Sequence, residues 1–330
     1  MHLKYNHILI IGIEGFVGRY LAQHLYSLNY KISGIYYQPF QEIGYTIENA
    51  NKTCEKNKYR LYQCDIRNFE QLFKIINKVS PDAIFHLAAQ SSVSVGEAKP
   101  IETFEINVLG FLNVLESIRQ TKIYPRVIYI SSAEVYGSSA RQKTKLTEKS
   151  LPKPMNFYAF SKYCAEKLCF YYINNLDFDI IILRPFSHTG PGQNEHFVFP
   201  RIAKEIVEIE IGKKEPNIKV GNLDVKRDYC DVRDIVKAYQ LALEKCSTGK
   251  VYNITSSKSY TIRFGVEYLL SLSSKKIKVL VDKSFIRNKD ILRLSGSADK
   301  FIKQTGWKPE IEFTKTLSDI LAYYRRGYAK

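Results

Sequence analysis

The sequence has no long hydrophobic run, no internal repeat and no linker of low complexity. None of its apolar stretches approaches the ~20 residues that a membrane-spanning helix requires. The short apolar run at residues 7–13 leads into a glycine loop, whereas a signal peptide would lead into a cleavage site. We therefore expect a cytoplasmic protein that is not inserted in a membrane.

Cysteines are few, and their spacing is not that of metal ligands. A chain of 330 residues is long enough to bury a core without a disulfide framework. We expect reduced thiols and no metal site for the six cysteines, which are Cys54, Cys64, Cys164, Cys169, Cys230 and Cys246.

Acidic residues are in the minority: 33 Asp and Glu stand against 49 Lys and Arg, a formal net charge of +16. Excess positive charge is one feature of nucleic-acid-binding proteins. Here, however, the lysines are scattered from end to end and form no compact basic arm, so we expect no nucleic-acid partner. A positive field would instead help to recruit a substrate that carries two phosphates.

Apolar strand-like runs alternate with helical patterns over the first 180 residues, which predicts a Rossmann-type, doubly wound parallel sheet. Long helices are predicted at residues 100–121, 158–175, 197–211 and 235–245. The predicted strands are residues 7–11, 31–37, 59–64, 83–87, 126–130, 179–183 and 251–254. Prolines and glycines in residues 185–193 predict that this stretch has no regular structure. We expect one domain in residues 1–185, to which residues 228–255 return, and a smaller α/β domain in residues 186–227 and 256–330.

Three glycines follow the first predicted strand, at Gly12, Gly15 and Gly18, and a helical pattern begins beside them. Strand, glycine loop and helix form the context of a dinucleotide-binding fingerprint, in which the helix N-terminus faces the pyrophosphate. A purely structural strand–helix turn is the alternative. We expect cofactor binding by this loop, with Phe16 and Val17 as part of it.

The predicted second strand ends in Tyr36-Tyr37-Gln38, with no carboxylate for the adenosine ribose and no basic residue for a 2′-phosphate. The missing carboxylate favours NADP, with NAD as the alternative, and we expect Tyr37 to contact the cofactor. Asp65 and Ile66 end the third strand, where an acid reaches the adenine amine or caps a helix. Cofactor contacts are also expected where small residues follow the fourth strand, at Leu87, Ala88, Ala89 and Gln90. His86, on that apolar strand, is expected to be a satisfied core histidine.

Tyr158 and Lys162 share one face of a predicted helix, because residues four apart in a helix are neighbours. An ammonium beside a phenol favours the phenolate, so the tyrosine can exchange a proton with a carbonyl or alcohol. A serine from a separate loop, such as Ser132, would fix the substrate oxygen. The motif alone is weak, since most such pairs lie on ordinary surface helices.

Together, these motifs resemble the extended short-chain dehydrogenase/reductase family that acts on nucleotide sugars. The resemblance rests on the glycine loop, on the run from Ser132 through Glu134 to Gly137, and on Tyr158-x-x-x-Lys162. Later strings narrow it to the GDP-4-dehydro-6-deoxy-D-mannose reductase branch, with GDP-mannose 4,6-dehydratase as a near relative. These strings are Arg184-Pro-Phe-Ser-His-Thr-Gly-Pro-Gly-Gln193, Gly221-Asn-Leu223, Arg227-Asp-Tyr-x-Asp-Val-Arg-Asp234 and Gly306-Trp307.

The resemblance implies a role for each matching residue. Ser132, Tyr158 and Lys162 would be the catalytic triad, with Glu134 beside them, while Lys162 would also hold the nicotinamide ribose and lower the tyrosine pKa. His188 would contact the nicotinamide end of the cofactor. The implied substrate-binding residues are Ser92, Ser187, Gln193, Arg201, Arg227, Arg287 and Asp290. Two positions depart from the family: Asn288 replaces a proline, and Ser187 replaces an asparagine, which leaves room for a larger sugar such as a heptose.

The implied activity is NAD(P)H-dependent reduction of the C4 keto group of a GDP-4-keto-6-deoxy sugar, in the synthesis of polysaccharide or lipopolysaccharide. The alternative is a GDP-mannose or GDP-heptose 4,6-dehydratase that uses Glu134 as its acid/base; the Gly190–Gln193 string favours the reductase. A 4-epimerase and a catalytically inactive cofactor-binding protein are more distant alternatives. The resemblance also implies a homodimer, or a tetramer of such dimers, formed through the helices that begin near Pro100 and Tyr158.

Overall fold

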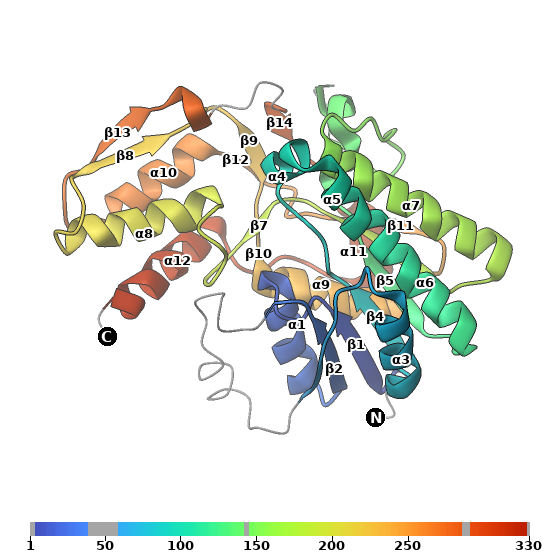
Figure 1. Cartoon of the computed structure of the whole chain (residues 1–330). Coiled ribbons are helices and arrows are strands. Elements are labelled where there is room, and N and C mark those ends of the chain that lie inside the picture. Colours follow the sequence, from blue (N-terminus) through green and yellow to red (C-terminus); the bar gives the residue numbers. More distant parts are fainter. Residues whose placement is uncertain (1–3, 39–58, 142–144, 286–290, 329–330) are drawn as a thin grey trace.

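The computed structural model describes residues 4–38, 59–141, 145–285 and 291–328 of the chain (Figure 1). Its centre is a seven-stranded, entirely parallel sheet in the order β11-β6-β5-β4-β1-β2-β3. The strands are β1 (His7–Ile11), β2 (Lys31–Tyr36), β3 (Tyr59–Gln63), β4 (Ala83–His86), β5 (Arg126–Ile130), β6 (Ile180–Pro185) and β11 (Val251–Ile254). The predicted Rossmann-type sheet is confirmed, because the central strands are continuous apolar runs suited to burial on both faces.

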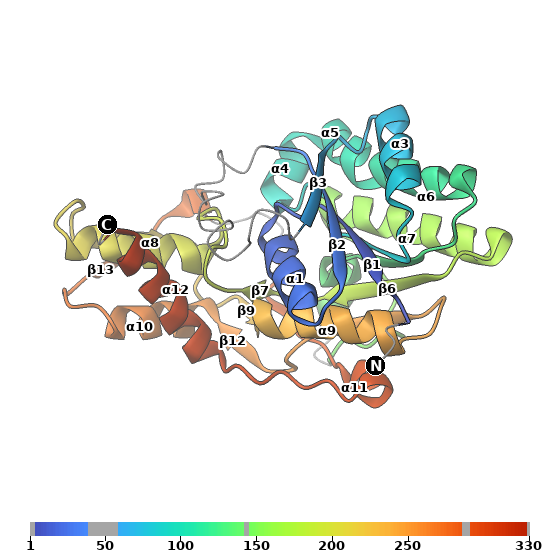
Figure 2. The ribbon, with the colours of Figure 1, turned by 90° about the horizontal axis from the view of Figure 1, so that it is seen from below.

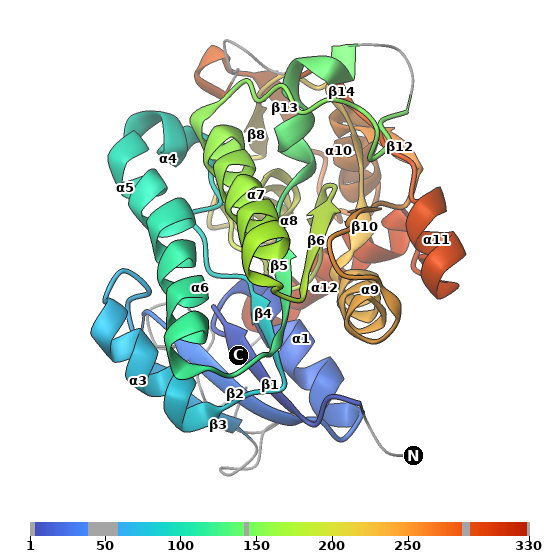
Figure 3. The same ribbon diagram turned by 90° about the vertical axis from the view of Figure 1, so that its right-hand side faces the viewer.

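Helices cover both faces of the sheet, as Figure 3 shows along its edge. On one face, α1 (Phe16–Ser27) and α9 (Val232–Lys245) pack side chains such as Leu21 and Tyr239 against Ile8 and Ile10. On the other face, α3 (Phe69–Val79), α6 (Gly110–Thr121) and α7 (Phe157–Leu176) pack against Leu9 and Ile11. The sheet is therefore buried between two helical layers.

The predicted long helix at residues 100–121 is interrupted. After α4 (Val93–Ala98), the chain forms α5 (Pro100–Phe104), a π-helical turn (Glu105–Leu109) and then α6. A π turn widens the helix by one residue, and such turns occur frequently at functional sites. This one carries the buried Asn107 toward the end of β4.

The C-terminal half adds a hydrophobic cluster separate from those on the two faces of the sheet, and the elements that carry it lie beside the sheet in Figure 2. Side chains such as Phe199, Leu269 and Leu317 form it. Its elements are α8 (Val198–Glu210), β8 (Asn217–Val220), α10 (Ile262–Ser271), β13 (Lys278–Val281) and α12 (Phe313–Tyr328). A small sheet places β9 (Lys226–Asp228) between β12 (Ser259–Thr261) and β14 (Arg293–Leu294), and α11 (Asp299–Thr305) packs near β11. The division of the chain into the two domains expected above stays a prediction.

The expectation that residues 185–193 have no regular structure was wrong in part. Pro185 ends β6, and β7 (His188–Thr189) pairs with β10 (Cys230–Asp231) in parallel. Backbone hydrogen bonds to a strand more than 40 residues away form this pair, so local sequence gave no sign of it.

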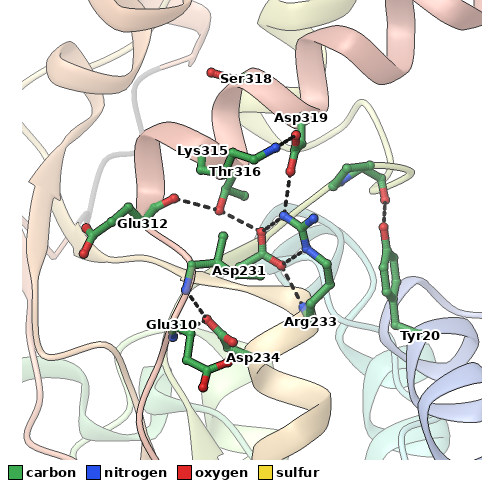
Figure 4. A network of polar contacts seen from close by, with 12 residues as sticks. Tyr20, Asp231, Arg233, Asp234, Glu310, Glu312, Lys315, Thr316, Ser318 and Asp319 are labelled. Atoms are coloured by element: carbon green, nitrogen blue, oxygen red, sulfur yellow. Dashed lines mark hydrogen bonds and ion pairs between the residues drawn. The ribbon is translucent and has the colours of Figure 1, made fainter. Parts of the chain in front are cut away.

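A polar network ties the start of α9 to α12 (Figure 4). The Asp231 carboxylate caps α9 by accepting the backbone N–H of Arg233 at 2.8 Å, and it also accepts the Thr316 hydroxyl at 2.7 Å. The Arg233 guanidinium bridges Asp231 and Asp319 at 2.7 and 2.8 Å. The network fixes α12 against the helix that packs on the central sheet.

His86 was predicted to be a core histidine whose ring nitrogens are hydrogen-bonded, and the second half of this prediction was wrong. Its ring lies in the core against Phe111 and Tyr129, as expected, yet neither ring nitrogen has a hydrogen-bond partner among the described residues. Burial lowers the pKa of His86 to about 3, so the ring is neutral.

The described residues include no helix that is long and apolar enough to cross a membrane.

Candidate active site

The glycine loop leaves a cradle that side chains would fill. Gly12 has φ +88°, and a Cβ there would lie 2.7 Å from the backbone nitrogen of Ala88. A Cβ on Gly18 would lie 2.3 Å from the carbonyl oxygen of Gly12, so only glycine allows α1 to approach the loop this closely. Gly15 is the N-cap of α1. The free backbone N–H groups of the first helical turn fit the pyrophosphate of a dinucleotide.

The first turn of α1 lies against the loop at residues 190–193. Phe16 and Val17 begin the helix, and a Cβ on Gly190 would lie 3.5 Å from the ring of Phe16. Arg19 donates to the carbonyl oxygen of Gly192 at 3.0 Å, and the Tyr20 hydroxyl, labelled in Figure 4, donates to that of Pro191 at 2.9 Å. The loop after β7 is thereby held over the start of the helix.

The acid at the end of β3 is paired locally. Asp65 accepts three hydrogen bonds from the Arg67 side chain, the shortest at 2.6 Å, and these bonds lower the pKa of Asp65. Asn68, and not Asp65, caps α3, so the capping alternative was wrong. Ile66 is buried against Gly110. Tyr37, just past β2, is 53% exposed, and its backbone N–H donates to Glu14 of the glycine loop at 2.9 Å.

The chain after β4 lies at the carboxyl edge of the sheet. The backbone N–H groups of Leu87 and Ala88 both donate to the carbonyl oxygen of Ile11, and Ala89 follows half-buried. Asn107, in the π turn, accepts the backbone N–H of Gln90 at 2.8 Å and donates to its carbonyl oxygen at 3.0 Å. This amide fixes the segment where the cofactor is expected to cross the strand.

Tyr158 and Ser132 lie together at this edge. Burial raises the pKa of Tyr158 to about 12, and a hydrogen bond with Ser132 opposes part of that rise. The Ser132 hydroxyl also accepts the backbone N–H of Glu134 at 3.2 Å. A neutral phenol held by a serine is suited to donating a proton to a substrate oxygen.

Lys162 lies one turn along α7 from Tyr158 and is almost fully buried. Its ammonium donates to the carbonyl oxygen of Ile130 at 2.7 Å, and burial lowers the pKa of Lys162 to about 8. Tyr158 owes its raised pKa to burial and to the negative charge of Glu134. The lowering of the tyrosine pKa by Lys162 therefore stays a prediction.

Asn156 positions both Glu134 and the tyrosine. Its side-chain oxygen caps α7 by accepting the backbone N–H of Ala159 at 2.8 Å, and its amide nitrogen donates to Glu134 at 3.3 Å. A Cβ on Gly96 would lie 3.1 Å from the Tyr158 nitrogen, so a glycine in α4 lets this helix pack onto the catalytic one. Neither Asn156 nor Gly96 was among the predicted site residues.

The segment after β6 holds the next predicted residues. Nδ1 of His188 is 3.0 Å from the carbonyl oxygen of Phe186, and burial lowers the pKa of His188. Ser187 is half-buried, and its carbonyl oxygen accepts the N–H of Cys230 at 3.0 Å. Gln193 accepts the Thr189 hydroxyl at 2.6 Å and donates to the carbonyl oxygen of His188, so its amide braces this loop.

The other predicted substrate-binding residues lie apart from one another along the chain. Ser92 caps α4. Arg201, on α8, pairs with Glu205 at 2.7 Å, and its guanidinium stacks over Phe285. Arg227 is buried in β9 and donates to the carbonyl oxygen of Ile291 at 2.5 Å. Arg287 and Asp290 lie outside the described residues, so their role stays a prediction.

A buried ion pair beneath the catalytic residues was not predicted. Glu166, one turn past Lys162, pairs with Arg184 of β6 at 2.6 Å and accepts the Ser131 hydroxyl at 2.5 Å. The sequence does carry a sign of Glu166: residues 162 and 166 are four apart, so the carboxylate lies on the same face of α7 as Lys162.

The cysteines were predicted to be reduced thiols. The described cysteines, Cys64, Cys164, Cys169, Cys230 and Cys246, are free in the structure.

Comparison with known proteins identifies the family. The pattern of the GDP-mannose 4,6 dehydratase family matches residues 9–320. The chain is 36% identical to the GDP-6-deoxy-D-mannose reductase of Pseudomonas aeruginosa over 73% of this chain and 80% of that protein. It is 30% identical to the GDP-6-deoxy-D-talose 4-dehydrogenase of Aggregatibacter actinomycetemcomitans over 91% of both.

A solved structure supports the same assignment. The fold superposes on that of RMD from Pseudomonas aeruginosa complexed with NADPH with a TM-score of 0.83, at 29% identity and over 98% of this chain and 99% of that one. The resemblance expected from the motifs is confirmed. The chain belongs to the GDP-mannose 4,6-dehydratase family of extended short-chain dehydrogenases/reductases.

Proposed function

We propose that this protein reduces the C4 keto group of a GDP-4-keto-6-deoxy sugar with NADPH or NADH. The observation that carries the proposal is the pairing of the protonated Tyr158 phenol with Ser132 at the sheet edge, beside the glycine cradle. The similarity to a GDP-6-deoxy-D-mannose reductase and to a GDP-6-deoxy-D-talose 4-dehydrogenase supports the GDP-sugar and the C4 position. The product would enter cytoplasmic synthesis of a polysaccharide or lipopolysaccharide.

The residues divide the work of reduction between them. The nicotinamide cofactor, held by the Gly12–Gly18 loop, supplies the hydride when it is bound. Ser132 orients the C4 oxygen of the sugar, and Tyr158 donates its proton to that oxygen as negative charge develops there. Lys162, cationic below a pH of about 8, stabilises the resulting phenolate, and it would hold the nicotinamide ribose when the cofactor is bound. We assign Ser187 to the sugar-binding side of the site, where its short side chain would leave room for a hexose or a heptose.

Dehydration of GDP-mannose is the second candidate, because Glu134 lies close enough to Tyr158 to raise its pKa. A 4,6-dehydratase uses such a carboxylate to remove the C5 proton as water leaves C6. A reductase has no elimination step and needs no second acid/base. Glu134 is therefore the residue that separates the two functions.

Glu134→Gln is expected to lower the rate of ketone reduction by less than about tenfold. The amide keeps the size of the side chain and can still accept the hydrogen bond from Asn156. Proton donation to the C4 oxygen during reduction needs only Tyr158. A dehydratase would lose roughly 10²–10⁴-fold with its general acid/base. Turnover of both substrates is measured side by side, with Asp224→Asn, an exposed residue of the C-terminal half, as the control.

The proposed function itself is tested by offering purified protein either GDP-4-keto-6-deoxy-mannose or GDP-mannose. We expect the first sugar to oxidise one cofactor per sugar consumed. Conversion of GDP-mannose to a keto sugar with no net change in cofactor would replace the proposal by a dehydratase. Mass spectrometry of nucleotides that co-purify with the protein would identify the sugar.

We also propose a homodimer, formed through α5, α6 and α7, which lie side by side in Figure 3. Large apolar side chains project from these helices and the π turn between them: Ile101, Leu109, Phe160 and Tyr171 are all at least 45% exposed. Such clustering of exposed apolar groups is typical of a protein–protein interface.

Ile101→Asp is expected to convert the dimer to a monomer in light scattering at micromolar concentration, since Ile101 is 75% exposed on these helices. Val281→Asp serves as the matched control, because Val281 is 64% exposed but lies on β13, away from the proposed interface. A wild-type monomer, or dissociation by both variants alike, would rule out this interface.

A further inference from the structure

A carboxylate occupies the corner between the glycine loop and the end of β2. Glu14 lies between Gly12 and Gly15, and its Oε1 accepts the backbone N–H of Tyr37 at 2.9 Å. The two residues are 23 positions apart, and parallel pairing of β1 with β2 brings them together. Backbone N–H groups of Gly12 and Ile13 bond to the carbonyl oxygen of Ile35 and hold the loop in this position.

The second oxygen of this carboxylate is buried but unsatisfied. Oε2 of Glu14 has no hydrogen-bond partner among the described residues. Burial raises the pKa of Glu14, while backbone hydrogen bonds from Tyr37, from Glu14 itself and from Gln38, together with the charge of Arg19, act in the opposite direction. A buried acceptor without a donor is costly unless a ligand supplies the donor.

The position of Glu14 matches a known requirement of dinucleotide sites. The adenosine half of the cofactor lies beyond the end of the second strand, where an acid at that strand end usually accepts the ribose 2′-hydroxyl. Tyr36, Tyr37 and Gln38 provide no such acid. In this fold, an acid reaches the same corner from the glycine loop instead.

In the part of the chain that the structure describes, the two cations near this corner, Arg67 and Arg19, are already engaged by other groups. Arg67, the cation whose field reaches Tyr37, is paired with Asp65 at 2.6 Å and with Glu105 at 3.5 Å. Arg19 donates to the carbonyl oxygen of Gly192. A 2′-phosphate carries between one and two negative charges and would meet the negative charge of Glu14 directly.

We infer that Glu14 selects the cofactor: its free oxygen accepts the 2′-hydroxyl of the adenosine ribose and excludes a 2′-phosphate, so that this chain prefers NAD(H) to NADP(H). The inference rests on the proposed function only in requiring that the glycine loop binds a dinucleotide. The missing carboxylate at the end of β2 favoured NADP when the sequence was considered alone. Because the Glu14 carboxylate would repel a 2′-phosphate just as an acid at the end of β2 would, its presence in the glycine loop favours NAD.

Calorimetric titration of the cofactors into the full-length protein, without any sugar, tests the inference. We expect the wild type to bind NADH at least about tenfold more tightly than NADPH, which corresponds to about 1.4 kcal/mol. Glu14→Gln removes the charge and keeps the shape, so NADPH affinity should rise about tenfold while NADH affinity changes by less than about threefold. Glu14→Thr, with a shorter uncharged acceptor, should shift the preference in the same direction if the glutamine variant is unstable.

Asp224→Asn is the control, because it removes one negative charge from an exposed ion pair with Arg263 in the C-terminal half. Its cofactor preference should equal that of the wild type. Tighter or equal binding of NADPH by the wild type would overturn the inference, as would an unchanged preference in both Glu14 variants. Failure of the wild type to bind either cofactor would overturn the proposed function as well, so the two failures are distinguishable.

Discussion

Tyr158→Phe is expected to lower kcat for ketone reduction by about 10²–10⁴-fold and to leave cofactor affinity within about threefold of the wild type. The substitution removes the hydroxyl that donates the proton, while the backbone nitrogen and Cβ of residue 158 keep their place against Gly96 of α4. Burial raises the pKa of Tyr158 to about 12, so the proton is present throughout the neutral range and its loss cannot be replaced by a change of pH. Stopped-flow absorbance of the reduced cofactor measures the step directly.

Tyr163→Phe provides the matched control on the same helix, since its ring lies against Lys167 and not at the sheet edge. It should retain nearly full activity. Activity of Tyr158→Phe close to that of the wild type would reject the role of the phenol as proton donor. Loss of cofactor binding in parallel with kcat would instead point to a structural role of the hydroxyl.

Glu166→Ala is expected to reduce the free energy of unfolding by about 3–5 kcal/mol, because it leaves the Arg184 guanidinium buried without its partner. Both side chains are at most 5% exposed, and two hydrogen bonds of 2.9 and 2.6 Å join them. The Ser131 hydroxyl would lose its acceptor as well, and Ser131 precedes the catalytic Ser132. Urea denaturation followed by circular dichroism measures the change.

A double substitution separates the charge from the packing. Glu166→Met with Arg184→Met should recover most of the lost stability, because apolar groups of similar size replace a buried ion pair at little cost. Glu312→Gln, which breaks the exposed pair with Lys258, should change stability by less than about 1 kcal/mol. A loss as small in Glu166→Ala as in Glu312→Gln would contradict the structural importance of the buried pair.

Much of the fold could be predicted because the central strands are encoded locally. A parallel strand buried on both faces is a continuous apolar run, and residues 8–11 and 127–130 each form one. The glycine loop was equally clear, since Gly12 and Gly18 sit where any Cβ would collide with backbone. The Tyr158 and Lys162 pair followed from helical spacing, although spacing could not show that Lys162 contacts the carbonyl oxygen of Ile130.

The features that escaped prediction depend on contacts between distant parts of the chain. Glu14 acquired its importance only when β2 brought the backbone of Tyr37 beside it. The β7 pair needed the strand at Cys230, and the π turn carries Asn107, whose amide reaches Gln90 and Ser161. Periodicity within one helix cannot reveal any of these partners.

Transfer of deuterium from labelled cofactor to the sugar tests the central claim most directly. The protein is given GDP-4-keto-6-deoxy-mannose and cofactor that carries deuterium at both hydride positions of the nicotinamide ring, and the product is analysed by NMR. Reduction predicts one deuterium at C4 of the sugar for each cofactor oxidised, and no such transfer in Tyr158→Phe. An unlabelled sugar with unoxidised cofactor, together with conversion of GDP-mannose to a keto sugar without net cofactor change, would contradict the account.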